Sequence, residues 1–181
     1  MEAHDQLLSA RFSRRTLLKG VGAAGLGVAL AQTVLVDGAA AQETVQDILD
    51  VTVTVEHFGV TILGAGLDSA MKGNFNPPIP DAVLAVVTAA RAQEQFHLDV
   101  FKSLGGNAMT TTFTVPDPKL LTDPKAFFGA VQQEETREIA AQIAAFNVFV
   151  ALKRPDLIKV SFQYAAEEAE HRLLANYAAR Q

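Results

Sequence analysis

Two pairs of residues, Glu94 with His97 and Glu168 with His171, place a glutamate three positions before a histidine. On a helix, residues i and i+3 project from the same face, so each pair can present a carboxylate oxygen and an imidazole nitrogen to one metal ion. A single pair is a weak signal, because the same spacing also stabilises solvated helices. Two such pairs among the three histidines after residue 41 indicate a metal site.

Further carboxylates could complete this site from two other segments. Glu56 lies in an otherwise apolar stretch, where a carboxylate is costly unless it is paired or binds a cation. Glu135 and Glu138 both share a helix face with Val131, and we keep both as candidates. Glu134 would lie about 100° from Glu135 around the helix and is the weaker candidate.

Four long segments, separated by Pro and Gly, are expected to position these residues. Residues 51–55 alternate like a strand, but we predict helix there because the flanking sequence is helical. A long connection runs from Asn107 to Leu121. The pattern predicts an all-α fold, a four-helix bundle with a long crossover between the second and third helices. The expected helices span about 43–72, 80–104, 124–153 and 155–181, with Asp123 as the N-cap of the third.

Composition limits the alternatives. The chain has 181 residues, of which 49% are hydrophobic and 19% charged, so it can form one domain with a sizeable core. It contains no cysteine, which excludes a disulfide scaffold and a thiolate metal site. The formal net charge of −5, with no basic cluster after the first twenty residues, argues against nucleic acid as a partner.

The N-terminus has the pattern of an export signal. Paired arginines, Arg14-Arg15, precede an apolar run from Gly20 to Val36 and then three alanines at 39–41. This pattern resembles a twin-arginine signal, which implies the Tat translocase as a partner and a periplasmic or otherwise exported location. An uncleaved membrane anchor is the alternative. We expect no permanent membrane span, because the run is short and Gln32 interrupts it. The predicted division is a signal peptide at 1–41 and a domain at 42–181.

One glutamate from each of two helices, with Glu-x-x-His from each of the other two, is typical of ferritin-like di-metal carboxylate proteins. From about Gln46 to Tyr177 the chain resembles the bacterial ferritin-like domain family with twin-arginine signals, which is related to the desiccation-related ferritin-like proteins. The resemblance rests on residues 55–58, 92–97, 123–128 with Glu135, and 165–171. It implies the metal ligands Glu56, Glu94, His97, Glu135, Glu168 and His171, and it favours Glu135 over Glu138. The chain departs from the family at Glu138 and Gln142, where Gly and Tyr are frequent.

The charges of this ligand set suit two divalent ions. Four glutamates supply four negative charges, which two such ions would balance inside a bundle of low dielectric constant. Carboxylate and imidazole ligands without thiolate favour two iron ions, or manganese, over structural zinc.

The function implied is that of an exported di-metal protein that reacts with dioxygen or peroxide. Iron oxidation, peroxide removal and oxidation of a small organic molecule all fit this description. The alternative is a non-catalytic ferritin-like envelope or stress-protection protein whose metal site is structural or lost. Iron storage in a closed shell is disfavoured by export, and the prediction leaves a homodimer open.

Other residues receive simpler interpretations. His57 is expected at the surface or beside a ligand, because its neighbour Glu56 points elsewhere. Tyr164, one turn before Glu168, is expected in the core or hydrogen-bonded to a ligand. The phenylalanines expected in the core are Phe127, Phe128, Phe146, Phe149 and Phe162.

Overall fold

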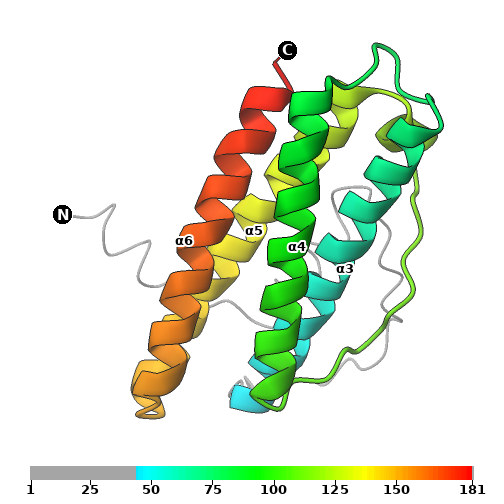
Figure 1. Ribbon diagram of the computed structural model, residues 1–181. Coiled ribbons are helices and arrows are strands. Elements are labelled where there is room, and N and C mark those ends of the chain that lie inside the picture. The colour runs from blue at the N-terminus through cyan, green and yellow to red at the C-terminus, as the bar shows by residue number, and fades with distance from the viewer. Residues whose placement is uncertain (1–43, 181) are drawn as a thin grey trace, which may run out of the picture.

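The computed structural model describes residues 44–180, which form four long α-helices and one short 3-10 helix, with no strand within this range (Figure 1). The elements are α3 (Val45–Met71), α4 (Asp81–Ser103), η1 (Pro118–Leu121), α5 (Pro124–Ala151) and α6 (Pro155–Ala178). The all-α prediction is confirmed, and each helix lies within a few residues of its expected bounds. The predicted signal at residues 1–41 lies outside the described part of the chain.

Local sequence explains where the helices begin. Thr44 caps α3 through a capping box, in which its hydroxyl accepts a hydrogen bond from the Asp47 amide and the Asp47 carboxylate accepts one from the Thr44 amide. Asp123 caps α5 as predicted, by accepting hydrogen bonds from the amides of Lys125 and Ala126. Pro124 then occupies the first turn, where its missing amide proton costs nothing.

The strand-like stretch at 51–55 is helical, as predicted. Its threonines are accommodated because Thr52 and Thr54 donate hydrogen bonds to the carbonyls four residues earlier, Ile48 and Asp50. The Thr54 hydroxyl also accepts a hydrogen bond from the Met109 amide. The alternating Val and Thr residues are therefore compatible with a helix, and Thr54 also binds the long connection that covers it.

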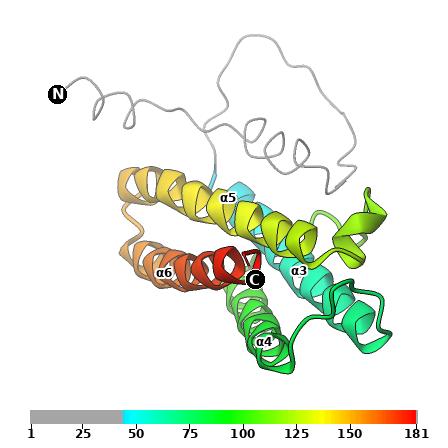
Figure 2. The same ribbon diagram turned by 90° about the horizontal axis from the view of Figure 1, so that it is seen from above.

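The long connection between α4 and α5 sets the direction of the helices. It runs back along the bundle beside α3, so that α4 and α5 point the same way, whereas α3 and α6 point the opposite way (Figure 1). Around the centre, α3 contacts α4 and α5, and α6 contacts α5 and α4 (Figure 2). This arrangement turns one face of every long helix toward a common axis.

Two apolar clusters fill the ends of the bundle. One contains Phe58, Leu63 and Phe127, and the other contains Val53 and Leu157. Along each helix, the predicted site residues lie between the segments that supply the two clusters. The acidic and histidine side chains therefore form a layer in the middle of the bundle, far from either end.

The core prediction is confirmed for three of the five phenylalanines and wrong for Phe162. Phe127, Phe128 and Phe149 are buried, whereas Phe146 is only half-buried. Phe162 is 66% exposed and packs at the surface against Phe146, with 6.4 Å between the ring centroids. The reason is helix phase, because Ser161 and Tyr164 occupy the inward face of α6 at this level.

Among residues 44–180, α3 alone is long and apolar enough to cross a membrane by the criteria of length and composition. Much of its most apolar window is buried against the other helices. Its one glutamate, Glu56, is fully buried and faces the centre of the bundle. These features are those of a core helix.

Candidate metal centre

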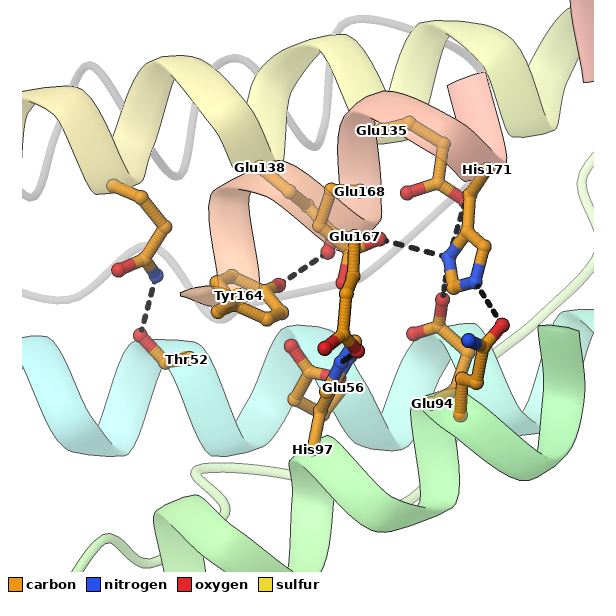
Figure 3. A network of polar contacts seen from close by, with 12 residues as sticks. Thr52, Glu56, Glu94, His97, Glu135, Glu138, Tyr164, Glu167, Glu168 and His171 are labelled. Carbon is orange, nitrogen blue, oxygen red and sulfur yellow. Dashed lines mark hydrogen bonds and ion pairs between the residues drawn. The ribbon is translucent and has the colours of Figure 1, made fainter. Parts of the chain in front are cut away.

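The structure brings all six predicted site residues together in the central layer, in two overlapping groups (Figure 3). One group consists of Glu56, Glu94, His97 and Glu168, and the other of Glu94, Glu135, Glu168 and His171. Within each group, one donor atom per residue lies within 4.8 Å of all the others. Glu94 and Glu168 belong to both groups. Each group could therefore hold a metal ion, with two carboxylates shared between them.

Each group takes its unshared residues from one pair of helices. Glu56 on α3 and His97 on α4 define what we call the α3–α4 half of the centre. Glu135 on α5 and His171 on α6 define the α5–α6 half. Glu138 belongs to neither group, which leaves Glu135 as the residue that α5 contributes.

Both histidines direct the Nδ1 nitrogen toward the carboxylates. His97 Nδ1 lies 2.9 Å from Glu168 Oε1 and 3.6 Å from Glu56 Oε2. His171 Nδ1 lies 3.0 Å from both Glu94 Oε1 and Glu168 Oε2, and 4.0 Å from Glu135 Oε1. Each imidazole thus approaches the glutamate of the other Glu-x-x-His pair, a cross-contact that the i,i+3 argument did not predict.

The outward Nε2 atoms are held by two residues that sequence analysis missed. His97 Nε2 lies 2.6 Å from Glu167 Oε2, and His171 Nε2 lies 2.9 Å from Gln93 Oε1. An Nε2–H donated to an oxygen fixes the ring and directs the Nδ1 lone pair toward a cation. The signal was present in the sequence, because Gln93 and Glu167 directly precede Glu94 and Glu168. Each of these residues supports the histidine of the opposite helix.

Burial makes this layer costly without a cation. Glu56, Glu94 and Glu168 are at most 1% exposed. Within residues 44–180, Glu56 Oε1, Glu94 Oε2 and Glu135 Oε2 are buried and have no hydrogen-bond partner. Carboxylate oxygens in this situation are strongly destabilising unless a cation or a proton compensates them. The orphaned oxygens and the oxygen-rich, thiolate-free donor set fit divalent metal ions.

The pKa shifts of the central groups favour protonated histidines in the absence of metal. Burial lowers the pKa of both histidines, but the carboxylates around them outweigh it and raise the pKa of His97 to about 11 and of His171 to about 10. Burial opposes ionisation of Glu168 as well, yet the two imidazoles lower its pKa to about 2. Burial raises the pKa of Glu56 and Glu135 well above the ordinary value, and neighbouring carboxylates add to the effect.

A fifth buried carboxylate, Glu138, is absent from the charge count made from four glutamates. Glu138 is buried and accepts a hydrogen bond from the Tyr164 hydroxyl at 2.5 Å. Burial, with repulsion from Glu168 and Glu94, raises the pKa of Glu138 well above its ordinary value. A protonated Glu138 adds no charge, so two divalent ions still balance the other four glutamates. Tyr164 is buried and bonds this acid, which lies outside both donor groups.

Gln142, the second departure from the family pattern, is also buried. Its amide nitrogen donates to the Thr52 hydroxyl at 3.3 Å, and its amide oxygen accepts a hydrogen bond from Ser161. This uncharged chain of hydrogen bonds joins α3, α5 and α6 next to the acidic layer.

The remaining candidates lie apart from the donor groups. Burial raises the pKa of Glu134, but its carboxylate pairs with Arg137 at 2.7 Å, which lowers the pKa and partly offsets that rise. His57 belongs to neither group, and its ring contacts Phe113 at 6.0 Å between centroids. Both placements agree with the lower weight given to these residues.

Gly59 makes room for a shared ligand. A Cβ atom at this position would lie only 3.0 Å from Glu94 Cδ and closer still to a carboxylate oxygen. Gly59 follows Glu56 by three residues and so lies on the same face of α3. The absence of a side chain lets α4 bring Glu94 against α3.

Comparison of the chain with family models, with curated proteins and with solved structures found no match. The case for a metal centre therefore rests on the geometry and chemistry of the central layer.

Proposed function

We propose that this chain is an exported, ferritin-like di-metal carboxylate protein that reacts with dioxygen or peroxide. The observation that carries the proposal is the pair of donor groups that share Glu94 and Glu168. The order of the helices and the long connection support the ferritin-like assignment. The Arg14-Arg15 pattern supports export.

The proposed ligands are Glu56 and His97 at one position, Glu135 and His171 at the other, and Glu94 and Glu168 between them. Two iron or manganese ions in these positions would supply the electrons for reduction of dioxygen or peroxide. Gln93 and Glu167 orient the two imidazoles through Nε2.

The chain also places two proton-bearing groups beside the proposed metal positions. Tyr164 and Glu138 form a buried pair of protonated groups beside the donor layer, because burial raises the pKa of both. A small cavity of about 30 Å³ reaches this pair and is also lined by Thr52, Arg137 and Gln142. A cavity of this size suits a single water molecule. Tyr164 and Glu138 are therefore placed to hold a proton close to where oxygen would be reduced.

Metal content is the first test. Full-length protein with its native N-terminus is purified from the cell envelope and analysed by elemental mass spectrometry, beside a Glu94→Ala/His171→Ala variant. Glu170→Ala serves as the control, because Glu170 lies on the same helix but is exposed and outside both donor groups. We expect about two iron or manganese ions per wild-type chain, retention in the control and loss in the double variant.

Reaction is the second test. Metal-free protein is reconstituted with Fe(II) in the absence of oxygen. Consumption of dioxygen or hydrogen peroxide is then compared between wild type and the Glu94→Ala/His171→Ala variant. Reaction dependent on Glu94 and His171 supports the oxidoreductase proposal. Bound metal without any reaction would support the non-catalytic alternative with a structural metal site. Well-folded protein that takes up no metal would contradict both the oxidoreductase and the structural metal site.

A further inference from the structure

One side of the centre opens into a cavity of about 270 Å³. All four long helices contribute to its wall, which includes Leu63, Val87, Val131 and Ala175. All but two of the lining residues are apolar or aromatic. The cavity is therefore an apolar chamber, open to solvent at a rim where Val86, Leu174 and Tyr177 are exposed, in a bundle whose central layer is acidic.

The two exceptions are Glu135 and His171, the unshared residues of the α5–α6 half. Both are about 5% exposed, and Glu135 Oε2 has no hydrogen-bond partner within residues 44–180. A molecule in the chamber would thus touch the residues of one proposed metal position. Glu56 and His97, of the other half, are not among the lining residues.

The volume and lining define the kind of molecule that fits. A dry cavity of about 150 Å³ holds benzene, so this chamber holds roughly ten heavy atoms. A hydrated cation or an anion would lose solvation against the apolar walls, and His171, the charged group at the wall, is already paired with Glu94 and Glu168. By contrast, two other cavities of about 10 and 30 Å³ are lined by Glu134 and Glu138 and suit single waters, although the smaller one also touches Glu135.

We propose that the chamber binds a small, uncharged, apolar organic molecule against the α5–α6 half of the centre. The inference rests on the proposed function in one respect, since it makes this molecule the organic substrate. Oxidation of such a compound by hydrogen peroxide balances without a further reductant. One C–H bond and the O–O bond break, one C–O and one O–H bond form, and the products are an alcohol and water.

Binding is tested first without metal, so that failure of the metal proposal does not decide the result. Chelator-treated full-length protein is titrated with naphthalene, which has ten carbon atoms and is fluorescent, and separately with the 2-naphthoate anion. We expect saturable binding of naphthalene at one site per chain and binding of naphthoate at least about 10-fold weaker, because of its charge. Equal affinity for the two, or no binding of naphthalene up to its solubility limit, would overturn the proposal.

A matched pair of variants locates the site. Ala90 is partly buried and lines the chamber, whereas the adjacent Ala89 is exposed and does not. Ala90→Phe should fill the chamber and weaken naphthalene binding at least about 10-fold, while Ala89→Phe should leave it within about twofold. If Ala90→Phe loses helical circular dichroism, Leu174→Asp at the partly exposed rim is used instead, with the same expectation. Unchanged affinity in the folded variant would refute the site.

Proximity to the centre is tested by spectroscopy. Cobalt(II) is added to the metal-free protein, and its visible absorption is recorded with and without naphthalene. We expect a change in wild type and Ala89→Phe but none in Ala90→Phe. If cobalt does not bind, the proposed function fails while the naphthalene titration still decides the chamber. If cobalt and naphthalene both bind without affecting each other's signals, the chamber does not lie next to the centre and the proposal is contradicted. It is also contradicted if sedimentation analysis shows a dimer whose formation excludes naphthalene.

Discussion

The α3–α4 half and the α5–α6 half of the centre use the same residue types but have different surroundings. Each contributes one unshared glutamate and one histidine to the layer that contains Glu94 and Glu168. His97 is supported by the carboxylate of Glu167, whereas His171 is supported by the neutral amide of Gln93. A carboxylate partner makes an imidazole a stronger donor to a cation than an amide does.

The space around the two halves differs as well. His97 packs edge-on against the buried ring of Tyr164, with centroids 4.9 Å apart. His171 instead faces the apolar chamber together with Glu135. If the centre holds two metal ions as proposed, we expect the α3–α4 half to hold its ion more tightly and the α5–α6 half to meet the organic molecule.

The largest effect is expected from a residue that both halves share. Glu168→Gln preserves side-chain size but removes the charge that contacts both imidazoles at 2.9 and 3.0 Å. We expect the metal affinity of both positions to fall by more than about 100-fold. This exceeds the loss that is typical when a residue that only hydrogen-bonds a ligand is replaced. Elemental analysis after dialysis measures this loss, with Glu170→Gln as the exposed control on the same helix. Retention of one ion by Glu168→Gln would show that the two positions do not share this residue.

Unshared residues should separate the halves. Glu56→Gln and Glu135→Gln should each reduce the metal content from about two ions to about one, because each belongs to a single donor group. Cobalt(II) spectra of these two variants can then show which metal position lies next to the chamber. Naphthalene should alter the spectrum of the ion that remains in Glu56→Gln and have little effect in Glu135→Gln. The reverse pattern would exchange the roles of the two halves.

How far the sequence predicted this centre depends on the range of the interactions involved. Glu-x-x-His spacing is local, so helix geometry alone placed Glu94 with His97 and Glu168 with His171 on shared faces. The resemblance favoured Glu135 over Glu138, and the donor groups include Glu135. Helix ends were predictable for the same local reason, as the Asp123 cap illustrates.

Contacts between helices were beyond prediction, because they depend on axial register. Gln93 and Glu167 adjoin the motifs, yet nothing in the spacing shows that each reaches a histidine on the opposite helix. Burial of Glu138 against Tyr164 likewise depends on the packing of α5 on α6. The core prediction for Phe162 is wrong because it rests on residue type alone and ignores the phase of α6.

The stability of the metal-free protein should fall as the pH rises from about 6 to 9. The pKa of His97 rises from 6.5 to about 11 and that of His171 to about 10 in the folded state, so their stabilisation is complete below pH 6.5 and is lost toward those values. Glu56 and Glu135 act in the same direction, since their raised pKa values favour the folded state only when the carboxyls are protonated.

The opposite sign applies to Glu168, because its pKa is lowered from 4.5 to about 2. Its contribution is present above pH 4.5 and is lost as the pH falls toward 2. The unfolding temperature of chelated protein should therefore peak near pH 4.5, decline above it as the raised pKa values of Glu56 and Glu135 begin to act, and drop by several degrees by pH 9. His97→Gln and His171→Gln should each flatten the alkaline limb, and to a similar degree, since both raised pKa values lie above pH 9. A rise in stability between pH 6 and 9 without metal would contradict this account.

The smallest effect should come from exchanging the partners of the two Nε2 atoms. Glu167→Gln gives His97 the kind of neutral partner that His171 has, and Gln93→Glu gives His171 a carboxylate. The Glu167 side chain is 40% exposed, so solvent moderates its influence, and we expect about a tenfold weaker α3–α4 position in Glu167→Gln. Gln93→Glu should strengthen the α5–α6 position, and competition with a chromophoric chelator measures both changes. The two halves could bind metal with unequal affinities that Glu167→Gln leaves unchanged. In that case the inequality must arise from their other difference, the Tyr164 ring beside one half and the apolar chamber beside the other.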